Sequence, residues 1–255
     1  MLQSTLSPGL AANLLRVQER TAAAARRGGR NPADITLVAV TKTISLDVIR
    51  QASGLGLRHF GENRVQEAAG KAATRGWNHA PGPVHAGQCE SADLFCPIWH
   101  MIGHLQTNKA RVAVGIFDLV HSVDSLGLAQ ALDTQCRRLG RRLPILLEVN
   151  VAGEASKNGF APDASFWLSV DQILVLPNLD VQGLMTVAPQ AGEPEDTRPV
   201  FRRLSQLRDE LRRRYPHLPW PHLSMGMTDD FEVAVEEGAT LLRLGRAIFG
   251  ERTVH

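Results

Sequence analysis

The feature that most constrains the fold of this chain is a repeated alternation of short apolar runs with helical segments. Eight strand-like runs, each followed by a helix or by the start of one, lie in residues 35–43, 59–64, 99–106, 117–125, 144–150, 180–188, 222–227 and 241–249. Strands that alternate with helices pair in parallel through right-handed crossovers. Eight such units in about 250 residues are typical of a (β/α)8 barrel of the TIM type, which is an α/β fold.

The helical segments have recognisable ends. Residues 10–27 are rich in alanine, leucine and arginine and are closed by Gly28 and Gly29, which predicts an extra N-terminal helix before the first strand. Ser45 resembles an N-cap, and Gly54 resembles the end of the next helix. An open doubly wound sheet is the rival fold, but its glycine fingerprint never follows a strand here. We therefore expect a single barrel domain over residues 1–255.

Residues 76–97 interrupt this alternation. The segment has no helical period and contains three prolines. Long stretches without secondary structure of their own are usually surface loops. We expect a loop insertion here.

Composition and charge exclude several classes of partner. The formal net charge of +2 is too small to indicate a nucleic acid or an anionic membrane as the main partner. Six arginines between Arg202 and Arg214 share their segment with apolar residues at helical spacing, which favours a solvated helix face over a nucleic-acid patch. Three cysteines at no metal-ligand spacing, no secretory signal and no apolar stretch of about 18 residues predict a cytoplasmic protein.

Barrel proteins place their functional sites at the carboxyl ends of the strands. The residues expected at those ends are Lys42, Glu62, Asn63, His104, Gln106, Asp124, Asn150, Met185, Thr186, Ser224, Met225, Gly226, Arg243 and Gly245. Many of them are polar, although a purely structural barrel could use almost any residue there. This end of the barrel is therefore the candidate site.

Lys42 ends the first apolar run. If Val38 and Val40 point into the barrel, strand alternation points Lys42 inward as well. An amine at a dry rim loses hydration, which favours the neutral, nucleophilic form that adds to an aldehyde to give an imine. A lysine that extends from a strand end to solvent is the alternative. Spacing alone does not choose between the two.

Arg243 lies on the same face of the last strand as Leu241 and Gly245. An inward guanidinium stays charged and is costly without an acceptor. A carboxylate such as Glu62 or Glu148 would satisfy it in a structural ion pair, and a ligand nitrogen would do so as well. Both interpretations remain open at this stage.

Glycine-bearing turns follow the seventh and eighth strands, at Gly226 and at Gly245. Loops after these strands commonly bind phosphate through backbone N–H groups, and glycine lets the backbone approach an anion closely. Glycine is also an ordinary turn residue. Taken together, an imine-forming lysine, an inward arginine and a phosphate cradle suggest a phosphorylated aldehyde as ligand.

Longer motifs resemble a known family. They read LVAVTKT, FGENRVQE, WHMIGHLQTNK, HSVDS, EVNVAGEASKNGF, GLMT, LSMGMTDDFEVAVEEGAT and LRLGRAIFGER. In this order, over about residues 35–252, they resemble the pyridoxal phosphate homeostasis proteins, also called the YggS/PROSC family. The resemblance implies a barrel similar to the N-terminal domain of alanine racemase. It also implies pyridoxal 5′-phosphate (PLP) held as an internal aldimine on Lys42.

The resemblance also assigns roles to other residues. It implies that Arg243 faces the pyridine nitrogen and that Asn63 lines the cofactor pocket. The residues that it places around the phosphate are Ser224, Met225, Gly226, Gly245 and Arg246. His104 and Asn150 match positions near the pocket.

Two departures from the family pattern stand out. Many members read GTAIFG where this chain reads GRAIFG, so Arg246 replaces a hydroxyl that would contact the phosphate. Its backbone N–H can still donate, and its guanidinium either adds a charge contact or points to solvent. The second departure is the segment 76–97, which is longer than usual.

The family's fold relatives include racemases, so a PLP-dependent amino-acid racemase is the alternative function. Proton transfer at an α-carbon needs an acid or base on each face of the cofactor. Lys42 serves one face, but the only tyrosine, Tyr215, ends the arginine-rich helix, and nothing in the sequence places it over the ring. An arginine against the pyridine nitrogen also weakens the ring as an electron sink. We therefore expect a cofactor carrier without efficient catalysis.

The expected partners follow from this interpretation. The resemblance implies a monomer in PLP homeostasis, with PLP-dependent apo-enzymes as candidate recipients and no nucleic acid or membrane partner. A metal-dependent barrel hydrolase is a third class and would need a His/Asp cluster. His100, His104 and His121 lie near strand regions, where such histidines are more often satisfied core or rim residues. No metal site is expected.

Overall fold

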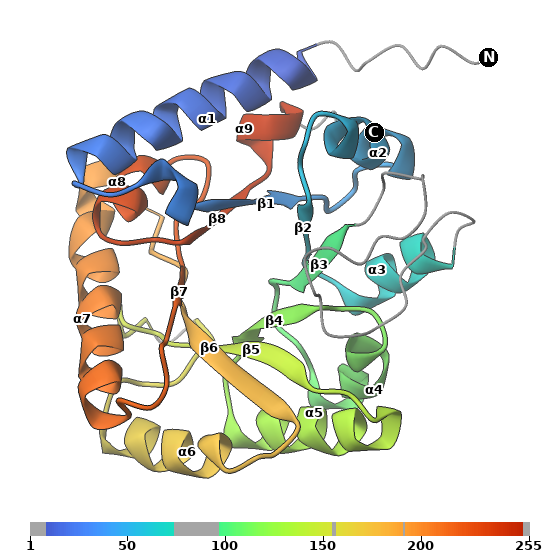
Figure 1. Cartoon of the computed structure of the whole chain (residues 1–255), viewed down its shortest axis with the longest axis vertical. Helices are drawn as coiled ribbons and strands as arrows, with labels where there is room; N and C mark the ends of the chain where they lie inside the picture. The colour runs from blue at the N-terminus through green and yellow to red at the C-terminus, as the bar shows by residue number, and fades with distance from the viewer. Residues whose placement is uncertain (1–8, 74–96, 155–156, 191, 252–255) are drawn as a thin grey trace.

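The computed structural model describes residues 9–73, 97–154, 157–190 and 192–251. Eight parallel strands, paired in chain order with β8 returning to β1, form a closed barrel (Figure 1). The strands are β1 Thr36–Val40, β2 His59–Glu62, β3 Ile98–Met101, β4 Leu119–Val123, β5 Leu143–Glu148, β6 Leu179–Met185, β7 His222–Ser224 and β8 Leu241–Leu244. The predicted fold class is confirmed. The loop predicted at 76–97 lies outside the described residues, apart from Pro97.

Helices surround the barrel in Figure 1. They are α1 Leu10–Arg27, α2 Leu46–Gly54, α3 Val65–Ala72, α4 Ala110–Val114, α5 Leu126–Leu139, α6 Ala164–Leu174, α7 Arg198–Arg214, α8 Phe231–Glu236 and α9 Arg246–Phe249, with 3-10 turns η1 Pro32–Asp34, η2 Thr107–Lys109 and η3 Pro194–Thr197. Local signals set several ends. Ser45 caps α2 by accepting from the Val48 N–H, and α2 ends at Gly54 as predicted.

Strand alternation divides the apolar side chains between two cores. The larger core lies between the barrel and its helices and includes Ala39, Leu242 and Leu244. A smaller cluster fills the barrel itself and consists of Val38, Leu119, Leu146, Met185 and Leu241. Since successive residues of a strand face opposite sides, Val40 and Arg243 continue the inward faces of β1 and β8. The predicted inward face of each of these two strands is confirmed.

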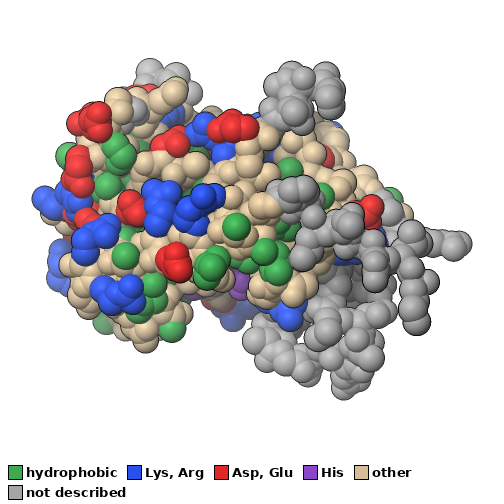
Figure 2. Space-filling view, turned by 90° about the horizontal axis from the view of Figure 1, so that it is seen from above, with side chains coloured by type: hydrophobic (Ala, Val, Ile, Leu, Met, Phe, Trp, Pro, Cys, Tyr) green, Lys and Arg blue, Asp and Glu red, His purple; other side chains and the backbone are tan. Residues whose placement is uncertain are grey.

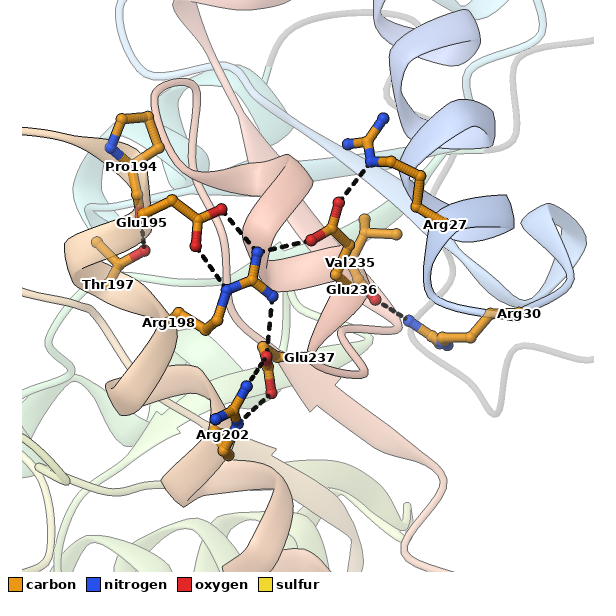
Figure 3. Close-up of polar contacts among 10 residues, drawn as sticks. All are labelled: Arg27, Arg30, Pro194, Glu195, Thr197, Arg198, Arg202, Val235, Glu236 and Glu237. Carbon is orange, nitrogen blue, oxygen red and sulfur yellow. Dashed lines mark hydrogen bonds and ion pairs between the residues drawn. The ribbon is translucent and has the colours of Figure 1, made fainter.

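Helix α1 lies outside the (β/α)8 pattern and packs along α8 and α9. An ion-pair network links its end to α7 and α8 (Figure 3). Arg27 pairs with Glu236 at 2.7 Å, and Arg198 contacts Glu236 at 2.7 Å and Glu237 at 2.9 Å. Isolated surface pairs contribute little, but a network that shares charges holds its members in one geometry. These contacts attach α1 to α7 and to the end of α8.

The surface is mixed in charge. Figure 2, which views the molecule from the side of α1, shows Lys and Arg side chains interspersed with Asp and Glu. The arginine-rich helix α7 buries Phe201, Leu204, Leu207 and Leu211 and exposes much of its opposite face, as predicted. In the described part of the chain, no helix is long and apolar enough to cross a membrane.

Candidate functional site

A pocket of about 420 Å³ opens at the carboxyl ends of the strands. Its volume falls within the range of small-molecule sites, roughly 300–1,000 Å³. The lining residues are Val40, Lys42, Asn63, Ile102, Gly103, His104, Glu148, Met185, Val187, Met227, Thr228, Asp229, Arg243, Gly245 and Arg246. Five of the eight cofactor-binding residues that the resemblance implied therefore share one cavity: Lys42, Asn63, Arg243, Gly245 and Arg246. They come from the ends of β1, β2 and β8, which are neighbours in the barrel.

Lys42 is half-buried two residues beyond the end of β1. The next residue, Thr43, has a φ of 65°, an unusual conformation for a β-branched side chain. Glu67 on α3 supports this turn by accepting from the Thr43 N–H at 2.5 Å. Strained backbone persists where surrounding structure fixes it, often at functional sites. The sharp turn keeps Lys42 at the rim and directs the chain away into α2.

A buried charge network supports the same turn from below. Lys71 on α3 donates to the Thr41 carbonyl at 2.7 Å and to Glu62 Oε1 at 2.5 Å. Thr41 Oγ1 donates to the same carboxylate oxygen at 2.6 Å. Burial raises the pKa of Glu62, and the bonds from Lys71 and Thr41 oppose that rise. The network therefore ties the residue before Lys42 to β2 and α3.

Arg243 has its acceptors on β7 and directly after β6. Its Nη1 donates to Ser224 Oγ at 2.6 Å and its Nη2 to the Thr186 carbonyl at 2.8 Å. Burial lowers the pKa of Arg243 to about 10, with Glu148 and Asp230 opposing the fall, so the group stays charged at neutral pH. The proposed ion-pair partners do not bond to it in the described residues, because Glu62 pairs with Lys71 and Glu148 acts only at longer range.

Three of the residues expected around a phosphate lie behind the pocket wall. Ser224 and Met225 are fully buried, and the Ser224 hydroxyl bonds to Arg243 and His121. Gly226 has a φ of 93°, and a Cβ there would lie 2.6 Å from Ala234 Cβ, so this turn requires glycine. Among the described residues, the N–H groups of Gly226 and Gly245 donate to no acceptor. Two donors are thus available at the glycine turns.

The side chain of Arg246 spans these two turns. Its Nη2 lies 2.6 Å from Asp229 Oδ2, and the two side chains are 46% and 77% exposed. Both residues line the pocket. The Arg246 guanidinium is thus held by a carboxylate in the pocket lining.

Glu148 is the buried acid of the pocket. Its Oε2 has no hydrogen-bond partner among the described residues, although its side chain is nearly inaccessible. Burial, followed by the charge of Asp124, raises its pKa to about 7, while Arg243 and His104 oppose the rise. His104 and Asp124 pair at 3.0 Å beside it. A buried oxygen rarely lacks a hydrogen-bond partner in a folded protein. Because Glu148 lines the pocket, its free oxygen is suited to bond with a ligand.

Other residues from the sequence analysis lie elsewhere. Asn150 lines a neighbouring cavity of about 200 Å³, where its Nδ2 donates to the Glu154 carbonyl at 2.8 Å. Tyr215 donates to Asp171 at 2.6 Å, away from the rim pocket. In the part of the chain that the structure describes, no group of three or more His, Cys, Asp or Glu side chains is arranged to hold a metal ion.

The sequence did not indicate a role for Lys71, and it indicated Glu148 only as a possible acceptor for Arg243. Alternation could have found Glu148, because Leu146 faces the barrel interior two residues earlier on β5. Lys71 had only a helical spacing of four residues from Glu67, which indicates an ordinary surface pair. Its contact with Glu62 depends on how α3 packs against the barrel.

Comparison with known proteins first defines the class. The family model for the alanine racemase N-terminal domain matches residues 12–253. The structure of alanine racemase from Clostridium difficile 630 superposes with a TM-score of 0.64 at 14% identity, covering 94% of this chain and 57% of that one. At this identity the likeness shows the shared barrel fold alone.

Closer relatives then define the family. The pyridoxal phosphate homeostasis protein of Aquifex aeolicus is 43% identical over 94% of this chain and 96% of its own length, and that of Pseudomonas aeruginosa is 41% identical over 95% and 96%. The structure of PipY from Synechococcus elongatus with PLP bound has a TM-score of 0.77 at 36% identity, covering 94% of this chain and all of that one. The chain belongs to the pyridoxal phosphate homeostasis protein family.

Proposed function

We propose that this chain binds pyridoxal 5′-phosphate in the rim pocket through Lys42 and that it holds and delivers the cofactor inside the cell. The observation that carries the proposal is one cavity of about 420 Å³ that joins a primary amine, a guanidinium and a glycine turn. These are the groups that an aldehyde, a pyridine nitrogen and a phosphate require.

The residues present fit this cofactor. When bound, PLP supplies an aldehyde carbon that a primary amine can attack. Lys42 would hold that carbon covalently, and Arg243 would donate to the ring nitrogen with an N–H that it does not use for Ser224 or Thr186. The unpaired N–H groups of Gly226 and Gly245 would hold the phosphate, while Asn63 and Met225 would support the ring and its turn.

The relatives support this function. The homologues from Aquifex aeolicus and Pseudomonas aeruginosa are both called pyridoxal phosphate homeostasis proteins. PipY, which matches this chain over its whole length, has been solved with PLP bound. This chain has the lysine and arginine in a shared pocket, as such a role requires.

Efficient turnover is not part of the proposal. The hydroxyl of Tyr215 is engaged with Asp171 and does not line the pocket, so it offers no second base. Arg243 would keep the ring nitrogen unprotonated, because its guanidinium cannot give up its proton near neutral pH. Glu148 is a pocket group besides Lys42 that could exchange a proton, and this observation favours racemisation as the second candidate function.

Absorption spectroscopy with reductive trapping tests the proposal. The protein mixed with PLP should develop visible absorption, and borohydride followed by peptide mapping should mark Lys42. Lys42→Ala should abolish both signals, whereas Lys109→Ala, on η2 outside the pocket, should retain them. A wild-type protein that stays colourless with excess PLP would refute the site. Sustained racemisation of alanine by the loaded protein would instead establish the racemase.

We also propose that the whole chain is one PLP-binding domain, that it acts as a cytoplasmic monomer, and that PLP-dependent apo-enzymes receive the cofactor from it. The packing of α1 on α8 and α9 supports the single domain. A single cooperative unfolding transition tests the single domain, and the mass from light scattering tests the monomer. Faster activation of a PLP-dependent apo-enzyme by the loaded protein than by an equal concentration of free PLP tests delivery.

A further inference from the structure

A line of polar side chains, half-buried at His59 and buried at the other members, runs through the barrel interior beneath the pocket. His59 on β2 lies with Nδ1 2.9 Å from Nε2 of His100 on β3. His100 in turn lies with Nδ1 2.8 Å from Nε2 of His121 on β4, and His121 Nδ1 lies 2.8 Å from Ser224 Oγ on β7. The line ends where Arg243 donates to Ser224 Oγ at 2.6 Å. Five strands thus contribute one continuous hydrogen-bonded chain.

The imidazoles in this chain are neutral. Burial lowers the pKa of His100 and His121 well below the ordinary value, and the neighbouring histidines add to the effect. For His59, burial and His222 lower the pKa to about 4, against a small opposing effect of Asp118. Arg243 is the charged group that faces His121, and it also disfavours protonation there. Each ring therefore carries one proton.

The direction of these protons follows from Arg243. A guanidinium has no acceptor, so Ser224 Oγ must accept from it and keeps its own proton for another bond. Within the described residues, the other partner of Ser224 Oγ is His121 Nδ1, which must then accept. His121 consequently carries its proton on Nε2 and donates to His100 Nδ1, and His100 donates from Nε2 to His59 Nδ1. Each hydrogen bond within the line then joins one donor to one acceptor.

We propose that His59, His100 and His121 form a relay in which each ring carries its proton on Nε2. In this order the Ser224 hydroxyl donates to His121, and its oxygen accepts from Arg243 and so positions Arg243 at the pocket. These histidines are positioning residues, because they act on the pocket through Ser224 and Arg243. In the reverse order, His121 would donate to Ser224, and the buried hydroxyl proton would have no acceptor among the described residues. A buried donor left without a partner is costly, so one order is selected.

The order has a chemical consequence. His59 Nδ1, at the end of the relay, already accepts from His100, and its Nε2 already carries a proton. An added proton therefore finds no free nitrogen unless the relay breaks. The relay should isolate the hydrogen bonds of Arg243 from changes of pH across the neutral range.

Nuclear magnetic resonance of the cofactor-free protein tests the order directly. Long-range proton–nitrogen spectra should show His59, His100 and His121 protonated at Nε2, with the same pattern at pH 6 and pH 8. Protonation of His121 at Nδ1, or rapid exchange between its two tautomers, would overturn the proposal. This measurement needs neither a variant nor the ligand.

Matched variants test the positioning of Arg243. His121→Phe keeps a ring but removes the acceptor for Ser224, whereas His121→Asn restores an acceptor close to the Nδ1 position. His222→Asn removes a half-buried imidazole that lies outside the relay and bonds to Thr240. The guanidinium nitrogen resonances of Arg243 should be distinct in the wild type, in His121→Asn and in His222→Asn, and averaged by rotation in His121→Phe.

The binding readout rests on the proposed function. Loss of one buried hydrogen bond in His121→Phe should weaken PLP binding about tenfold, and His121→Asn should recover most of it. Unchanged Arg243 resonances and affinity in a folded His121→Phe protein would overturn the positioning role. If the wild type binds no PLP, the proposed function fails, and the tautomers and Arg243 resonances still decide the relay.

Discussion

Glu62 and Glu148 are two buried carboxylates at the same end of the barrel, and their surroundings differ. Glu62 accepts from Lys71 at 2.5 Å and from Thr41 at 2.6 Å through one oxygen. Glu148 is influenced by Arg243 and His104 only at longer range, and it lines the pocket, which Glu62 does not. The Oε2 atom of each carboxylate has no hydrogen-bond partner among the described residues. The carboxylate next to Lys42 is therefore held by protein contacts outside the pocket, whereas the one across the barrel presents its acceptor to the pocket.

Removal of Lys71 should produce the largest effect, because it turns Glu62 into a second unpaired acid. Loss of one member of a buried pair typically costs about 3–5 kcal/mol. Lys71→Met should therefore lower the free energy of unfolding by about this amount in urea titrations near neutral pH. The double variant with Glu62→Gln should recover much of the loss, and a loss below about 1 kcal/mol in the single variant would contradict the role of the pair.

Glu148 should produce an effect that depends on pH. Its pKa is raised from 4.5 to about 7 in the folded chain, so the folded state binds more protons between these values. Stability is therefore lost as the pH rises through this window, by about 3 kcal/mol in total.

The variant Glu148→Gln removes this group from the titration. The difference in unfolding free energy between the cofactor-free variant and wild type should move in favour of the variant by about 3 kcal/mol from pH 4.5 to pH 8. A difference that stays constant over this range would show that Glu148 has an ordinary pKa.

Thr41→Val should have a smaller effect on the satisfied side. The change removes the donor to Glu62 Oε1 at 2.6 Å and leaves Lys71 in place. A hydrogen bond to a charged group contributes about 1.5–3 kcal/mol, so thermal unfolding should show a loss near the lower limit. Ser45→Ala at the N-cap of α2 is a control for a lost hydroxyl away from both carboxylates.

Asp124 and His104 should give the smallest changes, in opposite directions. Asp124 raises the pKa of Glu148 and His104 lowers it. Asp124→Asn should therefore lower the pKa of Glu148, and His104→Gln should raise it. Each change should be less than one pKa unit, which corresponds to less than about 1.4 kcal/mol. Carboxyl carbon NMR of Glu148 measures both. Shifts of the same sign would contradict the electrostatic origin of its pKa.

Much of the site was predictable because strand alternation is a local property. The inward direction of Lys42 and Arg243 follows from Val40 and Leu241, two residues earlier in each strand. The acceptors of Arg243 were not predictable in this way. Glu62 and Glu148 were the candidates, whereas the bonds go to Ser224 on β7 and to Thr186 directly after β6.

The buried histidines of the relay show the same limit. His100 and His121 were interpreted from the sequence as satisfied core or rim residues, and both are indeed buried and hydrogen-bonded. Their connection to Ser224 joins positions 103 residues apart. No local spacing indicates such a contact.

The sequence by itself determined the alternation of strands and helices, the inward faces of β1 and β8 and the glycine turns beyond β7 and β8, because each depends on neighbouring residues. Only the tertiary structure decided which buried charges are paired, which carboxylate faces the pocket and how the histidines connect. Those outcomes depend on closure of the barrel and on the register between strands, which bring distant residues within hydrogen-bond distance.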